Sequence, residues 1–449
     1  MAGDVARVVE TLAARFGERC SIRPADLDVA SHDASSEAAQ RPDAVVWPLT
    51  TDEVVEVVRA CGDGRVPLTP RGAGSSLEGN PIAVRGGIVL DCSRMTRVVA
   101  VRDADLQVDV EPGVVYAELN RQLRPHGLFF PPSPGGSADW ATVGGMAANN
   151  ASGIYSVKYG GTRDHVRAAT VVTGTGQVLR LGNRARKSAS GYHLLGLLVG
   201  SEGTLGVMTE LTLALAGLPA ARRRGGFVFP DAVAAARATA DTIGQGIDVA
   251  AIEFLDAATI AALNRFRPFG LTEAPTLLVE AHGSTAGVEE TWRIASEVAC
   301  GLGGSPLALA DPWSIREQAT RAVEAAHPGA ATVRADLAIP IGALPELVAA
   351  CEQCARERGL VVHCFGHAGI GILHALVLAG DAERTAAHAA RDALVERALA
   401  LGGSCSGEHG MGLGNRRYAA REHGPALAVM QGVKALFDPH GILNPGKMW

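Results

Sequence analysis

Four residues in the last hundred positions of the chain have side chains that can hold a metal or move a proton. His367 and His374 lie in GHAGIGILH, and Glu408 and His409 are adjacent in GEHG. Two imidazoles and one carboxylate can bind a divalent cation and leave coordination positions open for a substrate. An imidazole that titrates near neutral pH also suits the role of a general base.

Packing is the alternative role for these histidines. His374 is expected in a strand with Ile372 and Leu376 on its own face, and a single histidine in such a place is more often a core residue than a ligand. Glu408 beside His409 favours the functional interpretation, because a fully buried glutamate without a partner is rare.

Three stretches of small residues indicate a second kind of chemistry. Glycine has no Cβ and lets the main chain come close to a ligand, and convergent main-chain N–H groups can bind phosphate. One large, flat ligand that carries phosphate is therefore expected, although a long surface loop is the alternative for a single stretch. The segment Arg71-Gly72-Ala73-Gly74 lacks the third glycine of a GxGxxG dinucleotide motif. The three stretches are PPSPGGSADWATVGGMAANNASGIYSVKYGG (131–161), PRGAGSSLEGN (70–80) and VGSEGTLGVMTE (199–210).

Composition excludes several classes of protein. A chain of 449 residues exceeds one comfortable core, so two or three domains are expected. The net charge of −6 and the lack of a basic run argue against binding to nucleic acid or to an anionic membrane. No apolar run reaches ~18 residues, and the N-terminus is typical of an amphipathic helix rather than a signal peptide.

The eight cysteines show no paired spacing of a metal site. Cys351 and Cys354 form the one CxxC motif, and with Leu347 they share one face of an expected helix, so a place in the core is favoured over a redox role. A reducing compartment, and hence a cytoplasmic location, is expected.

Strand and helix patterns predict the elements that position these residues. Residues 1–217 read as mixed α+β, with a half-buried alternating strand at 106–111 and a hairpin turn at 174–176. Residues 218–402 repeat strand and helix, which predicts an antiparallel sheet with helices on one face. Residues 403–449 are again rich in glycine and are expected to return to the first domain.

Seven segments spread over nearly the whole chain, in a fixed order, carry a family resemblance. The chain resembles the FAD-linked 2-hydroxy-acid dehydrogenases of the vanillyl-alcohol-oxidase type, and within them it is most similar to the cytochrome-type D-lactate dehydrogenases. The segments are SHDASS…PDAVVWP, PRGAGSSLEG, ATVGGMAANNASG, RKSASGYHLLGLLVGSEGTLGVMTE, GHAGIGILH, GGSCSGEHGMGLGNRR and DPHGILNPGKMW.

The resemblance implies an α+β fold with three parts. Residues 1–217 are expected to form a two-part FAD-binding domain of the vanillyl-alcohol-oxidase (PCMH) type, and residues 218–402 a ferredoxin-like antiparallel-sheet domain that caps the substrate. Residues 403–449 are expected to return and complete the active site. The implied reaction is oxidation of a D-2-hydroxy acid, such as D-lactate, to the 2-oxo acid by hydride transfer to flavin N5. Glycolate or D-2-hydroxyglutarate is the alternative substrate, and a flavin-binding protein with impaired chemistry is the alternative function.

The resemblance also implies roles for individual residues. His367, His374 and Glu408 would hold zinc or manganese, His409 would be the general base, and Arg316 and Arg334 would bind the substrate carboxylate. Neither flavin loop offers a His or Cys for covalent attachment, so non-covalent FAD is expected. The expected FAD-binding residues are Arg71, Gly72, Gly74, Ser75, Ser76, Gly79, Pro132, Ser133, Thr142, Gly145, Asn149, Ser152, Gly153, Glu202, Val207 and Asn444.

One departure from the family pattern affects the expected metal site. Relatives have Asp and Asn where this chain has Ile370 and Ile372. Loss of a polar group that orients a metal-binding histidine typically lowers metal affinity or activity ~10–100-fold. The two isoleucines are therefore expected to affect metal binding more than FAD binding. The sequence does not identify the electron acceptor, for which a quinone, an electron-transfer protein and a cytochrome are candidates.

Overall fold

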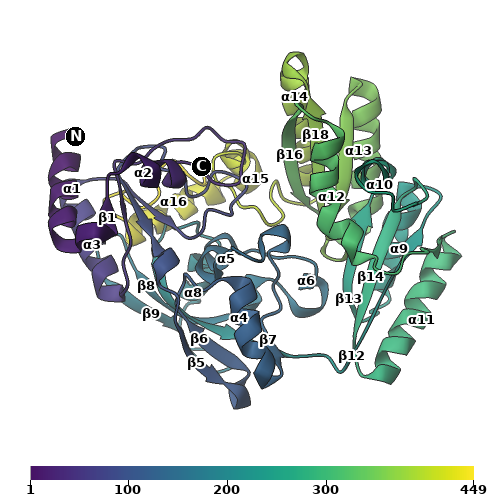
Figure 1. The fold of residues 1–449 in the computed structure, drawn as a ribbon, viewed down its shortest axis with the longest axis horizontal. Helices are drawn as coiled ribbons and strands as arrows, with labels where there is room; N and C mark the ends of the chain where they lie inside the picture. Colours follow the sequence, from purple (N-terminus) through teal and green to yellow (C-terminus); the bar gives the residue numbers. More distant parts are fainter. Residues whose placement is uncertain (1) are drawn as a thin grey trace. The chain divides into compact units, whose positions relative to one another are not determined.

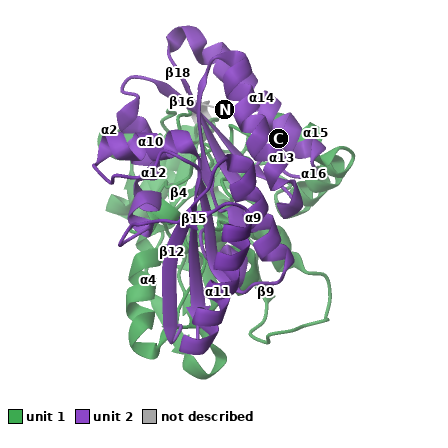
Figure 2. Ribbon diagram, turned by 90° about the vertical axis from the view of Figure 1, so that its right-hand side faces the viewer, with its two compact units in different colours: residues 1–152, 160–218, 408–449 green, residues 153–159, 219–407 purple. Residues whose placement is uncertain are grey.

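The computed structural model describes residues 2–449, which form two compact units (Figure 2). Of the described residues, unit 1 comprises 2–152, Gly160–Leu218 and Glu408–Trp449, and unit 2 comprises Gly153–Tyr159 and Pro219–Gly407. None of the helices within residues 2–449 is long and apolar enough to cross a bilayer. The expected assignment of roles to 1–217, 218–402 and 403–449 stays a prediction.

The first sheet of unit 1 has the strand order β1-β2-β4-β3, with the three strands β2, β4 and β3 parallel to one another. Figure 1 shows β1 of this sheet beside α1. Val8, Leu12 and Phe16 of the N-terminal helix are buried in the core that this sheet forms with its helices. The Thr50 hydroxyl accepts the N–H of Glu53 and so begins the next helix. The elements are α1 (Ala2–Phe16), α3 (Thr51–Gly64), β1 (Cys20–Ser21), β2 (Ala44–Val46), β3 (Leu68–Arg71) and β4 (Ile88–Asp91).

The second sheet of unit 1 is antiparallel, with the strand order β5-β6-β10-β8-β9. The expected turn at residues 174–176 does join β8 to β9. The expectation of a half-buried strand at 106–111 is wrong, because all four residues of β6 are buried. Asp109 tolerates this burial because Arg102 pairs with it at 2.5 Å and the Thr212 hydroxyl donates to it at 2.7 Å. The strands are β5 (Val98–Arg102), β6 (Gln107–Val110), β8 (Val166–Val172), β9 (Val178–Gly182) and β10 (Val207–Ala214).

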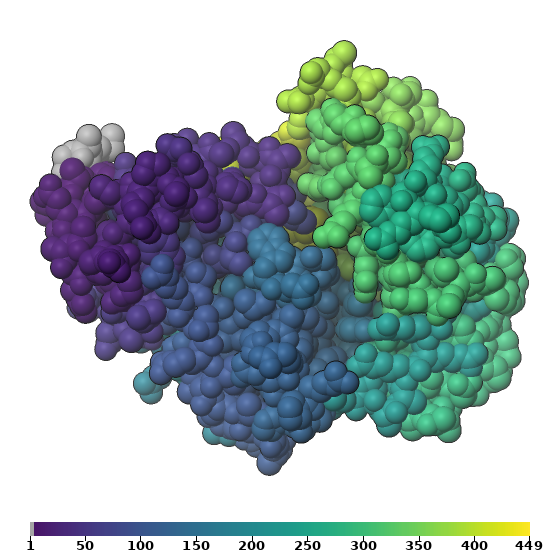
Figure 3. Space-filling view, viewed as in Figure 1, coloured from purple at the N-terminus to yellow at the C-terminus, as the bar shows by residue number. Residues whose placement is uncertain are grey.

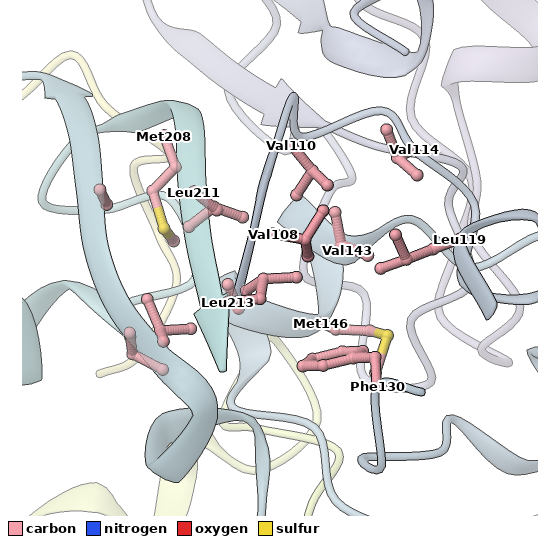
Figure 4. Close-up of a cluster of buried hydrophobic side chains, with 14 of the residues drawn as sticks. Val108, Val110, Val114, Leu119, Phe130, Val143, Met146, Met208, Leu211 and Leu213 are labelled. Carbon is pink, nitrogen blue, oxygen red and sulfur yellow. The ribbon is translucent and has the colours of Figure 1, made fainter. Parts of the chain in front are cut away.

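A hydrophobic cluster on this second sheet supports the central glycine-rich segment. Figure 4 shows Val108 and Val110 of β6 and Leu211 of β10 in one cluster with Met146 and Phe130. Helix α5, which carries many of the small residues, is thereby fixed on the sheet by its few large side chains. The remaining elements of unit 1 are α2 (Pro24–Ala30), α4 (Tyr116–Leu123), α5 (Val143–Asn149), α7 (Thr162–His165), α8 (Leu194–Leu198), α15 (Ala419–His423), α16 (Ala426–Phe437), β7 (Leu128–Phe129) and β11 (Ala216–Gly217).

Unit 2 is built on one antiparallel sheet of seven strands in the order β15-β12-β14-β13-β17-β18-β16. Every residue of β13 and of β18 is buried. The strands are β12 (Ala221–Val228), β13 (Val249–Leu255), β14 (Thr276–Gly283), β15 (Ser305–Pro306), β16 (Ala331–Ala338), β17 (Val361–Gly366) and β18 (Ile372–Ala379).

Helices lie on both faces of this sheet, so the expectation of helices on one face is wrong. Figure 2 shows α10 and α12 on one side of the strands and α9, α11 and α13 on the other. Ala251 and Leu255 of β13 pack with α10 and α12 in one cluster, and Figure 3 shows these two helices at the surface of unit 2. Cys351 and Cys354 are buried, as expected for core residues. The helices are α9 (Ala232–Gly244), α10 (Ala257–Phe266), α11 (Thr285–Gly301), α12 (Trp313–Ala326), α13 (Leu344–Arg358) and α14 (Arg384–Ala400).

Residues 153–159 belong to unit 2 although both of their chain neighbours belong to unit 1. This segment contains α6 (Ser156–Tyr159). The Tyr155 hydroxyl donates to Glu280 at 3.3 Å, and the Tyr159 hydroxyl lies 3.0 Å from Nδ1 of His282. The stretch that reads as one glycine-rich loop in the sequence is therefore divided, and its aromatic part is anchored on β14.

Candidate functional site

A cavity in unit 1 is walled mainly by main chain and small side chains. It opens to solvent, and the space that it encloses together with its open mouth is about 1210 Å³. All three glycine-rich stretches contribute to it, together with two residues of the C-terminal segment. The wall consists of Pro70–Leu77, Asn80, Pro81, Cys92, Pro112, Pro134, Ser137, Ala141, Thr142, Gly144–Met146, Ala148, Asn149, Ala151, Ser152, Glu202, Gly203, Gly206–Met208, Glu408 and His409.

Most residues expected to bind FAD lie in this wall, and five lie elsewhere. Those in the wall are Arg71, Gly72, Gly74, Ser75, Ser76, Thr142, Gly145, Asn149, Ser152, Glu202 and Val207. Gly153 belongs to unit 2, and the others outside the wall are Gly79, Pro132, Ser133 and Asn444. Among wall residues that sequence reasoning missed, Asn80, Met146 and Met208 lie within or beside the same glycine-rich stretches.

The glycines allow the loops to pack closely and keep the cavity open. A Cβ on Gly72 would collide with the Thr142 hydroxyl, and one on Gly144 would collide with Pro112. At Gly145 an added Cβ would meet only the Thr142 hydroxyl, at 3.2 Å, so a larger side chain there would occupy the cavity. A wall of main chain and small residues suits the close approach of a large, flat ligand with phosphate groups, such as FAD.

Arg71 lines the cavity, and its guanidinium is already engaged by main-chain carbonyls. It donates to the carbonyl oxygens of His32 at 2.9 Å and Val29 at 3.1 Å. Burial lowers the pKa of Arg71. The side chain therefore anchors the segment 29–32 against the loop that begins at residue 70.

Glu202 is in the wall, but its carboxylate binds protein groups on three sides. It accepts the N–H of Met411 at 2.6 Å, the N–H of Gly412 at 2.9 Å and the side-chain amide of Asn80 at 2.6 Å. Burial raises the pKa of Glu202, and the two main-chain N–H bonds oppose this shift. Asn444 donates to the carbonyl oxygens of Asn80 and Glu202, so it braces the same region from behind.

Glu408 and His409 reach the cavity because unit 1 side chains hold them there. The Ser152 hydroxyl donates to Oε2 of Glu408 at 2.8 Å, and the Asn149 side-chain amide donates to the carbonyl oxygen of His409 at 2.9 Å. Nε2 of His409 lies 4.0 Å from Oε1 of Glu408. An imidazole and a carboxylate thus stand together in the wall of the expected flavin cavity.

In unit 2, His367 and His374 are brought together by adjacent strands. His367 directly follows β17, and His374 lies in β18 opposite Phe365 of β17. Both side chains are buried, and their ring centroids are 5.4 Å apart and nearly perpendicular. The spacing seen in GHAGIGILH therefore becomes a contact between two imidazoles.

Two buried carboxylates that sequence reasoning missed face these histidines. Glu253 of β13 lies 2.8 and 3.0 Å from Nδ1 of His367, and Asp336 of β16 lies 3.2 Å from Nδ1 of His374. Glu253 is 0% and Asp336 is 1% exposed. Each is an acid within an apolar strand, VAAIEFL and ATVRADLA, and such placement is a signal because buried acids are almost always paired. Glu253 orients the ring of His367 through this contact, and Asp336 places a carboxylate beside His374, where the apolar side chains of Ile370 and Ile372 supply no polar group.

The two arginines expected to bind a substrate carboxylate both contact acids of the protein. Arg316 on α12 donates through Nε to Glu253 at 2.6 Å, and its guanidinium lies over the ring of Phe365. Arg334 on β16 donates to Glu324 on α12 at 3.0 Å. Arg316 and His367 therefore share the carboxylate of Glu253. Arg334 instead pairs with Glu324.

The donor chemistry of the two histidines fits a divalent cation. When a carboxylate accepts from Nδ1 of an imidazole, Nε2 is the nitrogen that ligates a metal, and the carboxylate fixes the ring and its tautomer. Two close, buried imidazoles of this kind suit Zn²⁺ or Mn²⁺.

Comparison with known proteins gives matches over most of the chain. Residues 42–182 match the family "FAD binding domain", and residues 218–448 match "FAD linked oxidases, C-terminal domain". "Probable D-lactate dehydrogenase, mitochondrial" of Danio rerio is 37% identical over 461 residues, which covers 99% of this chain and 92% of the relative. "Glycolate oxidase subunit GlcD" of Bacillus subtilis (strain 168) is 33% identical over 433 residues, which covers 94% and 92%.

A solved structure has the same overall fold. The crystal structure of p-cresol methylhydroxylase with bound substrate superposes with a TM-score of 0.83 at 17% identity, over 100% of this chain and 97% of the other. At this identity the similarity concerns the fold alone. Together with the two family matches, it confirms the α+β fold class expected from the sequence.

Proposed function

The chain belongs to the family of FAD-linked oxidoreductases that act on 2-hydroxy acids, and from this premise we propose that it oxidises a D-2-hydroxy acid, D-lactate in the first instance, to the 2-oxo acid. The D-lactate dehydrogenase relative in Danio rerio, with 37% identity over 99% of this chain, supports this substrate. FAD, when bound, supplies the two-electron acceptor that takes the hydride at N5.

The observation that carries the proposal is the position of His409 in the wall of the glycine-lined cavity. Loss of a hydride from the α-carbon requires the hydroxyl proton to leave as well, and an imidazole at that wall can accept it. Asn149 holds the main chain of His409, and Ser152 holds Glu408 beside it. Both anchors belong to the stretch that the sequence marks as flavin-binding.

The main chain of the three loops would hold FAD without a covalent bond, since it offers amide donors and close approach rather than a nucleophile. The five expected FAD-binding residues outside the wall would support these loops rather than contact the ligand, as the hydrogen bonds of Asn444 illustrate.

His367 and His374, with Glu408, would hold the divalent metal, zinc or manganese. A divalent cation favours an alkoxide by Lewis acidity. Glu253 and Asp336 would fix the two imidazoles, and Arg316 and Arg334 would supply positive charge for the substrate carboxylate, for which a guanidinium is suited.

Anaerobic mixing of the purified holoprotein with D-lactate tests the proposal. We expect the flavin absorbance to bleach, with L-lactate as the stereochemical control. Parallel mixing with glycolate and with D-2-hydroxyglutarate separates the substrates, and a protein that bleaches with none of the three is not a 2-hydroxy-acid dehydrogenase.

Glycolate is the second candidate substrate, because the glycolate oxidase subunit of Bacillus subtilis also matches 94% of this chain. A flavin-binding protein with impaired chemistry, the alternative raised by Ile370 and Ile372, is disfavoured because Glu253 and Asp336 still place polar groups beside the two histidines. Metal analysis separates these alternatives, since the impaired protein would be yellow and without stoichiometric zinc or manganese.

The electron acceptor and the location follow from less direct observations. We propose an external acceptor, either a quinone, an electron-transfer protein or a cytochrome, for the second half of the reaction. The cytoplasmic location stays a prediction from cysteine usage. Steady-state rates with each class of acceptor test the first statement, and cell fractionation tests the second.

A further inference from the structure

The main chain that follows His409 is held by one buried carboxylate. Glu202 is 6% exposed, and its two oxygens accept the N–H groups of Met411 and Gly412, at 2.6 and 2.9 Å. These donors lie two and three residues after His409. Hydrogen bonds from main-chain N–H groups to a carboxylate are among the stronger ones in proteins, so this contact fixes the local path of the chain.

Glycine at two positions lets the chain lie directly on that carboxylate. Gly410 has a φ of +84°, and a Cβ there would stand 2.7 Å from Oε1 of Glu202. Gly412 has a φ of +46°, and a Cβ there would collide with the carbonyl oxygen of Glu78. The turn 410–412 therefore has left-handed glycines where it meets Glu202, which is a close approach that other residues would prevent.

Glu202 is itself held in a costly conformation. Its φ is +53°, which is uncommon for a residue with a side chain. The side-chain amide of Asn80 donates to the same carboxylate oxygen that accepts from Gly412. Glu202 thus combines an uncommon backbone conformation, burial and three hydrogen bonds from the protein. These features indicate that Glu202 fixes the position of the chain around it.

A second buried side chain holds the turn from its other side. Asn415, which is 1% exposed, donates through its amide to the carbonyl oxygen of Gly410 at 2.9 Å. Asn415 is not in the wall of the cavity. The carbonyl of residue 410 and the N–H groups of residues 411 and 412 are thus all bound by side chains, which leaves the imidazole one residue earlier at the end of an immobilised turn.

We propose that Glu202 and Asn415 are positioning residues for His409: they immobilise the turn 410–412 and so set the imidazole at the cavity. This inference rests on the proposed function only in giving His409 the role of general base. From the sequence, Glu202 is expected to bind FAD. In this proposal it instead positions His409 by binding the turn 410–412 of the C-terminal segment. A misplacement of about 1 Å in a reacting group can cost ~10²-fold in rate, so loss of the anchor should be visible.

The test compares Glu202→Gln with Asn415→Ala, and uses Glu210→Gln as the matched control because Glu210 is an exposed acid on β10. Glutamine keeps the shape of Glu202 but turns an NH₂ group toward N–H donors. We expect each positioning variant to lower kcat per bound flavin ~10–100-fold while KM stays within about threefold. The control should match the wild type in both constants.

A readout without turnover follows the imidazole itself. With ¹³C-labelled histidine, the Cε1–H resonance of His409 is assigned by its loss in His409→Ala, and we expect it to shift or broaden in both positioning variants and not in Glu210→Gln. Unchanged kcat per flavin would overturn the proposal, as would a fall in kcat without any change in that resonance. A lower flavin content with normal kcat per flavin would also overturn it, because Glu202 would then act on the cofactor.

The two readouts separate this inference from the proposed function. If His409→Ala leaves flavin reduction unaltered, His409 is not the base and the proposed role fails, yet the resonance still reports whether Glu202 and Asn415 set its position. If Glu202→Gln does not fold, Asn415→Ala is judged by the same two measurements.

Discussion

The cavity of unit 1 and the histidine pair of unit 2 solve the problem of buried polar groups in different ways. The cavity is lined mainly by main chain and small residues, and a Cβ on Gly72 or Gly144 would collide with a neighbouring loop. The histidine pair is made of large polar side chains, and each imidazole faces a buried carboxylate. The first arrangement leaves room for a ligand of its own size, whereas the second fixes donor atoms for a small one.

The buried charges of the two regions differ in their partners. Glu253 of unit 2 contacts both His367 and Arg316, so charge is met by charge. In unit 1 Glu202 is met by N–H groups, and Lys447 by the carbonyl of Ile82 at 2.5 Å and Oδ1 of Asn444 at 3.3 Å. Neutral dipoles compensate a buried charge less completely than an opposite charge in direct contact does, and burial lowers the pKa of Lys447.

His409→Ala should have the largest effect on turnover. The substitution removes the imidazole from the wall of the cavity and leaves the loops intact, so FAD content should be retained while flavin reduction slows by ~10²–10⁴-fold. Stopped-flow reduction with the best substrate measures this. His193→Ala removes an exposed histidine of unit 1 and serves as the control. An unaltered reduction rate would remove His409 from the mechanism and leave the cavity as a binding site alone.

Lys447→Met tests the buried cation of unit 1. Burial lowers the pKa of Lys447 from its ordinary value of 10.5 to about 8. Between these two pH values the unfolded chain binds more protons than the folded one, so stability rises with pH. The wild type should therefore gain about 3 kcal/mol relative to Lys447→Met as pH rises from about 7 to about 10.5. Urea unfolding of both proteins at several pH values measures the difference.

The comparison with a single substitution cancels the titration of the other lysines. Lys187→Met, at an exposed position, should show no such gain and is the matched control. A stability difference between wild type and Lys447→Met that does not change across this range would mean that the cation is compensated as fully as Glu253 is, and the contrast between the two regions would fail.

The sequence predicts the cavity better than it predicts the histidine centre, for a physical reason. A run of glycines lets the main chain approach a ligand closely, and this property can be recognised from the local sequence alone. Gly72 and Gly145 could therefore be assigned to a ligand-binding surface without a structure. The division of that run at Gly153 could not, because it depends on Tyr155 and Tyr159 finding partners on β14.

Partnerships across a sheet are not local. Glu253 and Asp336 lie more than thirty residues from the histidines that they face, on strands whose neighbours are set only by the strand order. Each appears in the sequence as one acid in an apolar strand, a signal that marks a buried partner without naming it. The role of Glu202 is hidden for the same reason, since its donors follow two hundred residues later.

Glu253→Gln tests the histidine pair of unit 2 and has the smallest effect that we expect among these substitutions. The amide keeps the shape of the side chain but not the charge that His367 and Arg316 contact, so the ring orientation and the basicity of His367 should both suffer. We expect Zn²⁺ affinity, measured by competition with a chelator, to fall ~10–100-fold while FAD affinity stays unchanged, because the cavity of unit 1 contains no part of this group. Glu324→Gln removes the partner of Arg334 and should leave zinc affinity as it is. Unchanged zinc affinity in Glu253→Gln would mean that the negative charge of Glu253 is not needed for metal binding. The two histidines would then be positioned by side-chain packing alone.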